Sequence, residues 1–171
     1  MVNRLKSKLI IIRGNSGSGK GTIAKKVSES SEHKIAIVEQ DYLRRFILKE
    51  KEKDAEALPN IIGLIEQTLI FALDHGYIVI LDGILSMDRY GEMLSRLKDV
   101  CSDHHFFYLD VSFEETLRRH STKPNAHEFG ETELRRWYKQ KDVTGFDGEI
   151  IIPESASIEQ AVDIVKRQSH L

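Results

Sequence analysis

The sequence predicts an α/β fold in which a five-stranded parallel sheet carries helices on both faces. Short apolar runs alternate along the 171 residues with segments whose apolar residues recur at helical spacing. This alternation is typical of parallel strands buried on both sides by helices. We find no internal repeat, no low-complexity tract and no Pro/Gly/Ser-rich linker, so residues 1–171 are expected to form a single domain.

The elements of this fold follow one another in order. Strands are expected at residues 9–12, 35–38, 77–81, 105–109 and 149–152. Helices are expected to begin near Lys20, after Asp41, at Pro59, before Tyr90, after Ser112, before Leu134 and after Ser157. In the helix after Asp41, four apolar residues share one side: Tyr42, Leu43, Phe46 and Ile47. Ser112 with Glu115, and Ser157 with Gln160, have the spacing of capping boxes.

A glycine-rich segment follows the first expected strand and leads into the first expected helix, the context of a phosphate-binding loop. Its residues, all expected to bind ATP, are Gly14, Asn15, Ser16, Gly17, Ser18, Gly19, Lys20, Gly21 and Thr22. Glycines allow successive N–H groups to turn toward one anion, and the helix N-terminus adds further N–H groups. Lys20 is expected to act in catalysis by contacting the β- and γ-phosphates.

The residue after the lysine departs from the Walker A pattern, which places a serine or threonine there to bind magnesium. This position holds Gly21, and the hydroxyl comes one residue later, at Thr22. Asp82 ends the apolar run of the third strand, where a carboxylate can hold magnesium directly or through water. We therefore expect Thr22 and Asp82 at the metal, and Gly83 to allow a substrate close to the backbone.

Asp41 is the expected catalytic base. It follows the second strand, and carboxyl ends of parallel strands meet at the ligand-binding edge of the sheet. Phosphoryl transfer to a hydroxyl benefits from a carboxylate that orients the acceptor and takes its proton. Arg44 and Arg45 follow, so these three residues with Asp82 and Gly83 are expected to bind the acceptor substrate. The alternative is that Asp41 only caps a helix.

A polar segment at 121–130 is flanked by basic residues and predicts a lid over approximately residues 118–140. The flanking residues are Arg118, Arg119, Lys123, Arg135 and Arg136. Arginines that arrive with a closing lid can stabilise the charge of the transferred phosphoryl group, and we assign Arg119 and Arg136 to this role. The alternative is ordinary helix-surface ion pairing of Arg118 and Arg119 with Glu114 and Glu115. His120 and His127 lack a third ligand at a suitable spacing, so no metal is expected there.

Composition narrows the class of protein further. The net charge of -2 and the pI near 6.4 give no electrostatic footprint for nucleic acid. Cys101 is the only cysteine, which excludes a disulfide framework and a cysteine zinc site. No apolar run reaches the about 20 residues of a membrane span, and a signal peptide is not recognisable. A cytoplasmic monomer or homodimer without membrane or nucleic-acid partners is expected.

With these residues in place, the chain resembles the P-loop small-molecule kinases, a group that includes adenylate, gluconate and shikimate kinases, chloramphenicol phosphotransferase and zeta-toxin kinases. The resemblance rests on residues 14–22, Asp41, Asp82-Gly83 and the basic lid, and Gly-Lys-Gly-Thr is similar to the adenylate kinase loop. It implies a three-layer P-loop kinase fold with a short helical lid, ATP and Mg²⁺, and Asp41 as base. It also implies adenine between the lid's first arginine, Arg118, and residues 154–156.

The expected function is therefore an ATP-dependent kinase that transfers the γ-phosphoryl group to a hydroxyl of a metabolite, an antibiotic or a nucleotide-sugar. A nucleoside monophosphate kinase is one alternative, although a phosphate acceptor would need no base such as Asp41. A nucleotide-binding regulatory module without transfer activity is the other. The acceptor pocket is expected to be shaped by residues 42–53, 60–73 and 87–90.

Overall fold

The computed structural model describes residues 5–51, 57–122, 127 and 129–171, and shows one five-stranded sheet with the strand order β2-β3-β1-β4-β5. All neighbouring strands pair in parallel, as predicted. The strands are β1 (Leu5–Gly14), β2 (Ile35–Glu39), β3 (Ile78–Gly83), β4 (Cys101–Asp110) and β5 (Ile150–Pro153). β4 starts four residues earlier than predicted, because the polar, half-buried stretch before Phe106 pairs with β1 although it is not apolar.

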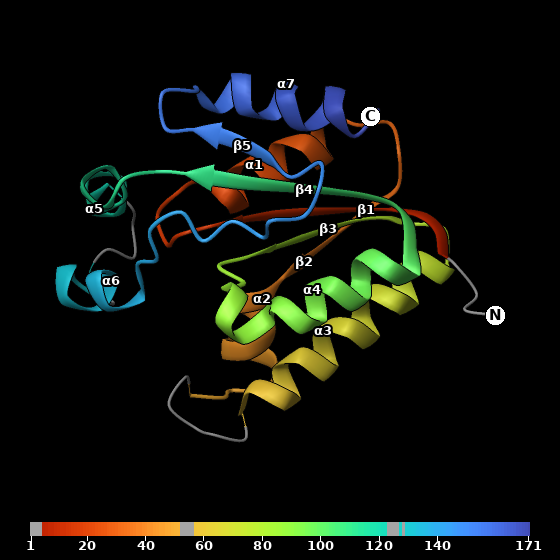
Figure 1. Ribbon diagram of the computed structural model, residues 1–171, viewed down its shortest axis with the longest axis horizontal. Helices are drawn as coiled ribbons and strands as arrows, with labels where there is room; N and C mark the ends of the chain where they lie inside the picture. The colour runs from red at the N-terminus through yellow and green to blue at the C-terminus, as the bar shows by residue number, and fades with distance from the viewer. Residues whose placement is uncertain (1–4, 52–56, 123–126, 128) are drawn as a thin grey trace.

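The helices form a layer on each face of the sheet, which gives the three-layer α/β fold that the sequence predicts (Figure 1). α1 (Lys20–Glu29) and α7 (Ile158–Gln168) cover one face, and α3 (Ala57–Asp74) and α4 (Met87–Val100) cover the other. α5 (Phe113–Ser121) and α6 (Glu131–Trp137) lie beyond the carboxyl ends of the strands. The remaining elements are α2 (Gln40–Tyr42) and η1 (Leu43–Ile47), a π-helix.

The central strand explains why the first apolar run is continuous rather than alternating. Leu9 and Ile11 belong to the core on the side of α3 and α4, whereas Ile10 and Ile12 belong to the core on the side of α1 and α7. None of the four has exposed surface. A central parallel strand buries both of its faces, so every position favours an apolar side chain.

The helix predicted after Asp41 is short, and most of its apolar side chains face solvent. Tyr42, Phe46 and Ile47 are 51%, 61% and 54% exposed, and the Tyr42 and Phe46 rings stack with centroids 5.2 Å apart. Leu43 alone packs against the core. The wider π-helical turn, closed by the Leu48 N–H donating to the Leu43 carbonyl, replaces the regular winding on which the predicted apolar face depended.

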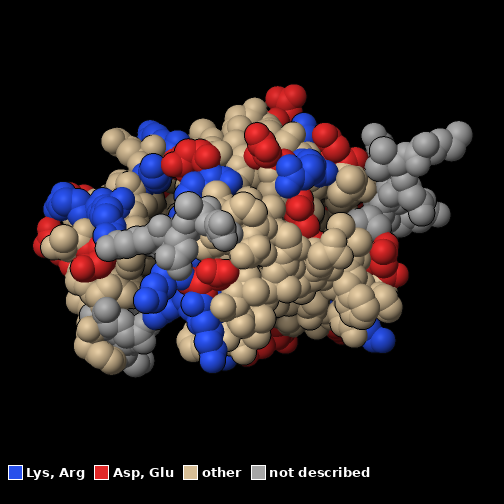
Figure 2. Space-filling view, turned by 90° about the horizontal axis from the view of Figure 1, so that it is seen from below, with Lys and Arg blue, Asp and Glu red and all other residues tan. Residues whose placement is uncertain are grey.

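α3 is the one described helix that is long and apolar enough to cross a membrane, with a mean hydropathy of 1.3 over 18 residues. A helix from Pro59 was predicted, but no apolar run of the length of a membrane span was expected. Its stripe of Ile61, Ile65 and Leu69 is fully buried against the sheet and α4, so core packing accounts for much of its apolar composition. Figure 2 views the molecule from the α3 side and shows a broad uncharged area there. Ile70 and Phe71 of α3 are exposed.

Candidate active site

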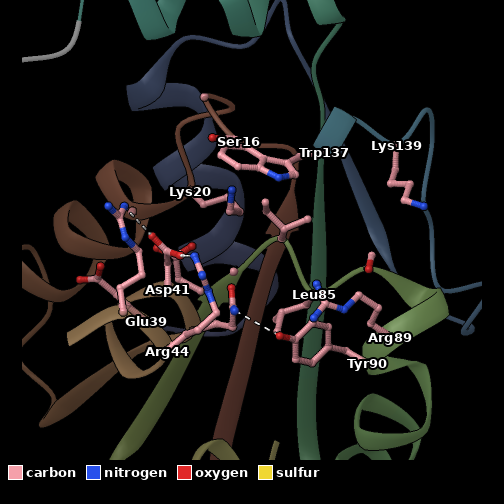
Figure 3. A pocket seen from close by; sticks show the side chains of 18 of the residues that line it. Ser16, Lys20, Glu39, Asp41, Arg44, Leu85, Arg89, Tyr90, Trp137 and Lys139 are labelled. Carbon is pink, nitrogen blue, oxygen red and sulfur yellow. Dashed lines mark hydrogen bonds and ion pairs between the residues drawn. The ribbon is translucent and has the colours of Figure 1, made fainter. Parts of the chain in front are cut away.

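A cavity of about 890 Å³ opens beyond the carboxyl ends of β1, β2 and β3, at the edge of the sheet where the sequence places the ligand. Four segments form its walls: the glycine-rich loop, the α2–η1 turn, the loop that follows β3, and α6 with the residues after it (Figure 3). Its volume is at the upper end of the range of small-molecule sites. One cavity can therefore receive both the phosphates and an acceptor.

The glycine-rich loop has the backbone that a phosphate cradle requires. Gly17 has a φ of +84°, and a Cβ atom there would lie 2.7 Å from the Thr116 carbonyl oxygen. At Gly14, with a φ of +147°, a Cβ atom would lie 2.9 Å from the Leu109 carbonyl oxygen. Larger residues fit at neither position. The Lys20 ammonium donates to the Asn15 carbonyl at 2.9 Å, across the loop that it is expected to serve.

Six residues of the predicted loop line the cavity: Ser16, Gly17, Gly19, Lys20, Gly21 and Thr22. The side chains of Asn15 and Ser18 do not, since both are buried within the protein. Asn15 is bound to the backbone of Lys139, donating from Nδ2 to the carbonyl at 2.8 Å and accepting from the N–H at 2.9 Å. The Asn15 side chain thus ties the chain after α6 to the loop instead of serving the phosphates.

Asp41, Arg44 and Arg45 line the same cavity, as predicted for acceptor-binding residues. The Asp41 carboxylate accepts hydrogen bonds from Arg44 through one oxygen and from Arg45, at 3.4 Å, through the other. Gln40, for which no role was predicted, is almost fully buried and donates from Nε2 to the Tyr90 hydroxyl at 3.1 Å. This bond joins α2 to α4 at the base of the cavity (Figure 3).

Asp82 and Gly83 also line the cavity, but each has a packing constraint that only the structure reveals. The Asp82 Oδ2 atom lies 3.1 Å from the position of a Cβ atom on Gly21, so Gly21 is the loop residue that faces this carboxylate. Gly83 packs against the Gln40 side chain, because a Cβ atom added at position 83 would lie only 2.8 Å from the Cβ of Gln40. Its small size therefore serves protein packing as well as the cavity.

A magnesium ion fits the chemistry of this edge. Among the described residues, no group of three or more His, Cys, Asp or Glu side chains gathers as a metal site. Magnesium usually takes one or two carboxylates and completes its coordination with water and substrate phosphates. Asp82, beside Gly21 and next to the phosphate loop, supplies such a carboxylate, and the exposed Thr22 hydroxyl is one residue further along α1.

The first two arginines of the predicted lid contact different parts of the protein. Arg119 bridges three segments: its guanidinium donates to Glu115 at 2.6 Å, to the Ser18 carbonyl at 2.9 Å and to the Glu154 carbonyl at 3.3 Å. Arg118 instead pairs with Glu115 and lines a separate groove between α5 and α6. The two guanidiniums, Arg118 first, lower the pKa of Glu115 to about 2. Arg119, and not Arg118, thus contacts the loop at 154–156, beside which the resemblance implies adenine.

The other two described arginines of the lid also separate. Arg136 lines the active-site cavity, where a phosphate contact is expected, whereas Arg135 pairs with Glu131 and lies over the Phe113 ring in the groove beside Arg118. Lys123 lies outside the described residues. Sequence reasoning identified the basic segment, but neighbouring residues on a helix project in different directions.

Aromatic residues of the lid enter the cavity, which the sequence did not predict. Leu134 of α6 is buried, whereas Trp137 lines the cavity, next to Ser16 and above Lys20 in the view of Figure 3. The Trp137 and Phe129 rings meet edge-on, with centroids 5.1 Å apart. His120 is buried, stacks on Phe129 and hydrogen-bonds the Phe129 carbonyl through Nε2 at 2.8 Å, which agrees with a structural histidine.

Comparisons with known proteins agree with this geometry. A family model described as an AAA domain matches residues 9–145. The APS kinase of Mycobacterium tuberculosis, solved with AMPPNP and APS, is 16% identical over 97% of this chain and 99% of its own, with a TM-score of 0.75. A gluconokinase from Sinorhizobium meliloti 1021 is 15% identical over 98% and 93% of the two chains, with a TM-score of 0.65.

The tunicamycin resistance protein of Deinococcus radiodurans is 21% identical over 97% of each chain, also with a TM-score of 0.65. No curated protein matches the sequence significantly. The family match covers most of the chain, from β1 through the phosphate loop to the residues after α6, and the structural neighbours share the five-stranded P-loop kinase fold. The chain therefore belongs to this AAA domain family and has the fold of the P-loop kinases.

Proposed function

We propose that the protein is an ATP-dependent kinase that transfers the γ-phosphoryl group of ATP to a hydroxyl of a small molecule. The observation that carries this proposal is that one cavity holds both the phosphate-loop lysine, Lys20, and the carboxylate of Asp41. A protein that only binds nucleotide needs no carboxylate opposite its phosphate loop. A nucleoside monophosphate kinase, whose acceptor is a phosphate, needs no base there either.

The chain's own groups can bind and orient the phosphates. Backbone N–H groups of the loop and the N-terminus of α1 can surround the anion, and Lys20 and Arg136 supply cations from the loop and from α6. Magnesium, when held by Asp82 and by Thr22 or water, would neutralise charge that develops on the phosphate oxygens. Arg119 is placed beside the loop by its contacts with Ser18 and Glu154, on the side where the family resemblance puts adenine.

Asp41 is proposed to act as the base. A carboxylate has about four lone-pair positions on its two oxygens, and Arg44 and Arg45 occupy one on each. Room therefore remains for an acceptor hydroxyl to donate to Asp41 while both arginines hold the carboxylate. The hydroxyl oxygen attacks the γ-phosphorus, the bond to the β–γ bridging oxygen breaks, the hydroxyl proton passes to Asp41, and ADP leaves.

The identity of the acceptor is the open part of the proposal. The structural neighbours include an APS kinase, a gluconokinase and a tunicamycin resistance protein, whose named substrates and activities differ widely. A fold shared at such low identity does not transfer a substrate to this chain. We propose a small hydroxylated molecule as the acceptor and the cytoplasm as the site of action, with the protein a monomer or a homodimer.

The test is a screen for acceptor-dependent ADP release over hydroxylated metabolites, aminoglycosides, nucleosides and nucleotide-sugars, followed by Asp41→Asn. The variant should bind ATP as the wild type does, while transfer falls by roughly 10²–10⁴-fold, the usual contribution of a positioned base. Asp163→Asn is the matched control, because Asp163 forms the same i,i+4 pair with Arg167 on the distant α7. Slow ATP hydrolysis that no acceptor stimulates would refute the kinase, and a parallel loss of ATP affinity in Asp41→Asn would move Asp41 to the metal site.

A further inference from the structure

The residue immediately before the phosphate loop is a buried arginine. Arg13 is the penultimate residue of β1, and its side chain has no exposed surface. A guanidinium taken out of water is costly unless its charge is paired and its donors are satisfied. Each guanidinium nitrogen of Arg13 therefore needs a hydrogen-bond partner within the protein.

All three guanidinium nitrogens of Arg13 have partners, and these come from two distant segments. Nε and Nη2 donate to the Leu85 carbonyl at 3.1 Å and 3.0 Å, in the loop that follows β3. Nη2 also donates to Asp142 at 2.9 Å and Nη1 to Glu149 at 3.1 Å, both in the segment that runs from α6 back to β5. The guanidinium lies near the Tyr108 ring, 5.7 Å from its centroid. Lysine, with a single nitrogen, cannot reproduce this fork.

The bond to Leu85 holds a strained turn in the wall of the cavity. Leu85 has a φ of +45°, in the left-handed region that a leucine rarely adopts. Such conformations persist only where the surroundings enforce them, and they gather at functional sites. The Leu85 side chain is buried against Gly83, and residues 82–86 all line the cavity. Arg13 thus fixes the loop that presents Asp82 and the wall beside Tyr90.

The bonds to Asp142 and Glu149 hold the root of the lid, which is the segment at 138–149 that leads from α6 back to β5. Asp142 also accepts from the Met87 N–H at 3.0 Å, so one carboxylate joins Arg13, the start of α4 and the return segment. Glu149 accepts in addition from the N–H and the hydroxyl of Thr144 at 2.6 Å and 2.9 Å. Asn15 in turn binds the backbone of Lys139. Arg13 and Asn15, the residues on both sides of Gly14, therefore both hold the segment that follows α6.

We propose that Arg13 is a positioning residue for phosphoryl transfer, which sets the loop after Asp82 and the root of the lid at a fixed place relative to the phosphate loop. The inference rests on the proposed kinase function. In the proposed function, ATP phosphates bind mainly to the loop's own N–H groups, whereas the acceptor lies beside Asp41 and the cavity wall formed by residues 82–90. Loss of Arg13 should therefore disturb the alignment of the acceptor more than the binding of ATP.

The test is Arg13→Lys, which keeps the charge and loses the fork, with Arg96→Lys as control because Arg96 pairs with Glu66 on the surface. At a temperature where the variant is folded, kcat/KM for the acceptor should fall by roughly 10²-fold, the effect of a displacement of about 1 Å. The Kd for a non-hydrolysable ATP analogue should stay within about threefold. A folded variant with wild-type acceptor kinetics, or one whose whole loss lies in the analogue's Kd, would overturn the proposal.

Hydrogen exchange gives a readout that does not depend on turnover. In Arg13→Lys, amides of residues 83–87 and 139–144 should exchange faster while those of α7 do not; unchanged exchange in both segments would overturn the proposal. If Arg13→Lys does not fold, Asp142→Asn, which removes one of the paired charges, should show the same changes at smaller size. If no acceptor stimulates ADP release by the wild type, the kinase function fails, and the exchange result still decides whether Arg13 holds these segments.

Discussion

Gly21 offers a test of the metal site that separates stability from activity. It is the second residue of α1, and it is not among the described glycines with positive φ, so its backbone does not require glycine. Glycine within a helix costs about 0.5–1 kcal/mol relative to alanine. The reason for glycine lies instead in the Asp82 carboxylate, 3.1 Å from where a Cβ atom would be. Gly21→Ala should therefore keep or slightly raise stability and lower phosphoryl transfer.

The expected changes in stability and transfer follow from this 3.1 Å distance and from a control glycine, Gly63. At Gly63, on the exposed side of α3, a Cβ atom would meet nothing within 4 Å. Gly63→Ala should raise the free energy of unfolding by about 0.5–1 kcal/mol, or the melting temperature by about 1–4 °C, without affecting transfer. In Gly21→Ala the Asp82 carboxylate must give way by a few tenths of an ångström. Because a misplacement of about 1 Å costs roughly 10²-fold, we expect transfer to fall by about tenfold.

The assay combines urea unfolding with ADP release measured over a range of magnesium concentrations. The loss of phosphoryl transfer in Gly21→Ala should be largest at low magnesium concentration and should shrink as the magnesium concentration rises. The reason is that the new methyl group crowds the Asp82 carboxylate, a metal ligand, and leaves the phosphate loop in place. Transfer and magnesium dependence like the wild type's would refute the assignment of Asp82 as a magnesium ligand beside Gly21. A large loss of stability in Gly21→Ala alone would show that glycine at position 21 serves the packing of Asp82 and not the metal site.

Two further predictions concern the lid. Arg119→Ala should weaken ATP binding by about tenfold to a hundredfold, which corresponds to the loss of one or two charged hydrogen bonds. Arg118→Ala should leave the Kd for ATP within about twofold. Equal effects of the two variants in calorimetry would contradict the assignment of Arg119, and not Arg118, to the phosphate loop. Trp137 is the only tryptophan and lines the cavity, so its emission should change when Mg-ATP binds, and by less in Arg136→Ala. Flat emission at saturating Mg-ATP, with binding established by calorimetry, would indicate a lid that does not move.

The architecture and the edge of the sheet at which the site lies could be predicted from local patterns in the sequence. Apolar runs such as Leu9–Ile12 and the glycine spacing of the phosphate loop are local signals, because burial on both faces and a tight anion cradle each constrain consecutive residues. The places of Asp41 and Asp82 followed from a general rule, since the carboxyl ends of parallel strands meet at one edge. The structure brings both carboxylates to the cavity that Lys20 lines.

Which side chains reach that cavity, and which contact its loop from outside, depends on the packing of distant segments. Arg118 and Arg119 are neighbours in sequence, yet successive positions on a helix project about 100° apart. Arg119 contacts the Ser18 carbonyl of the phosphate loop but is not among the described residues that line the cavity, and Arg118 lines the groove between α5 and α6. Arg13 ends an apolar run, and its partners Asp142 and Glu149 lie more than 120 residues away. Neither Trp137 nor Leu134 carries a sequence signal that separates cavity from core. Contacts between distant segments leave no periodic trace in a single sequence, because each depends on where the whole fold brings its elements together.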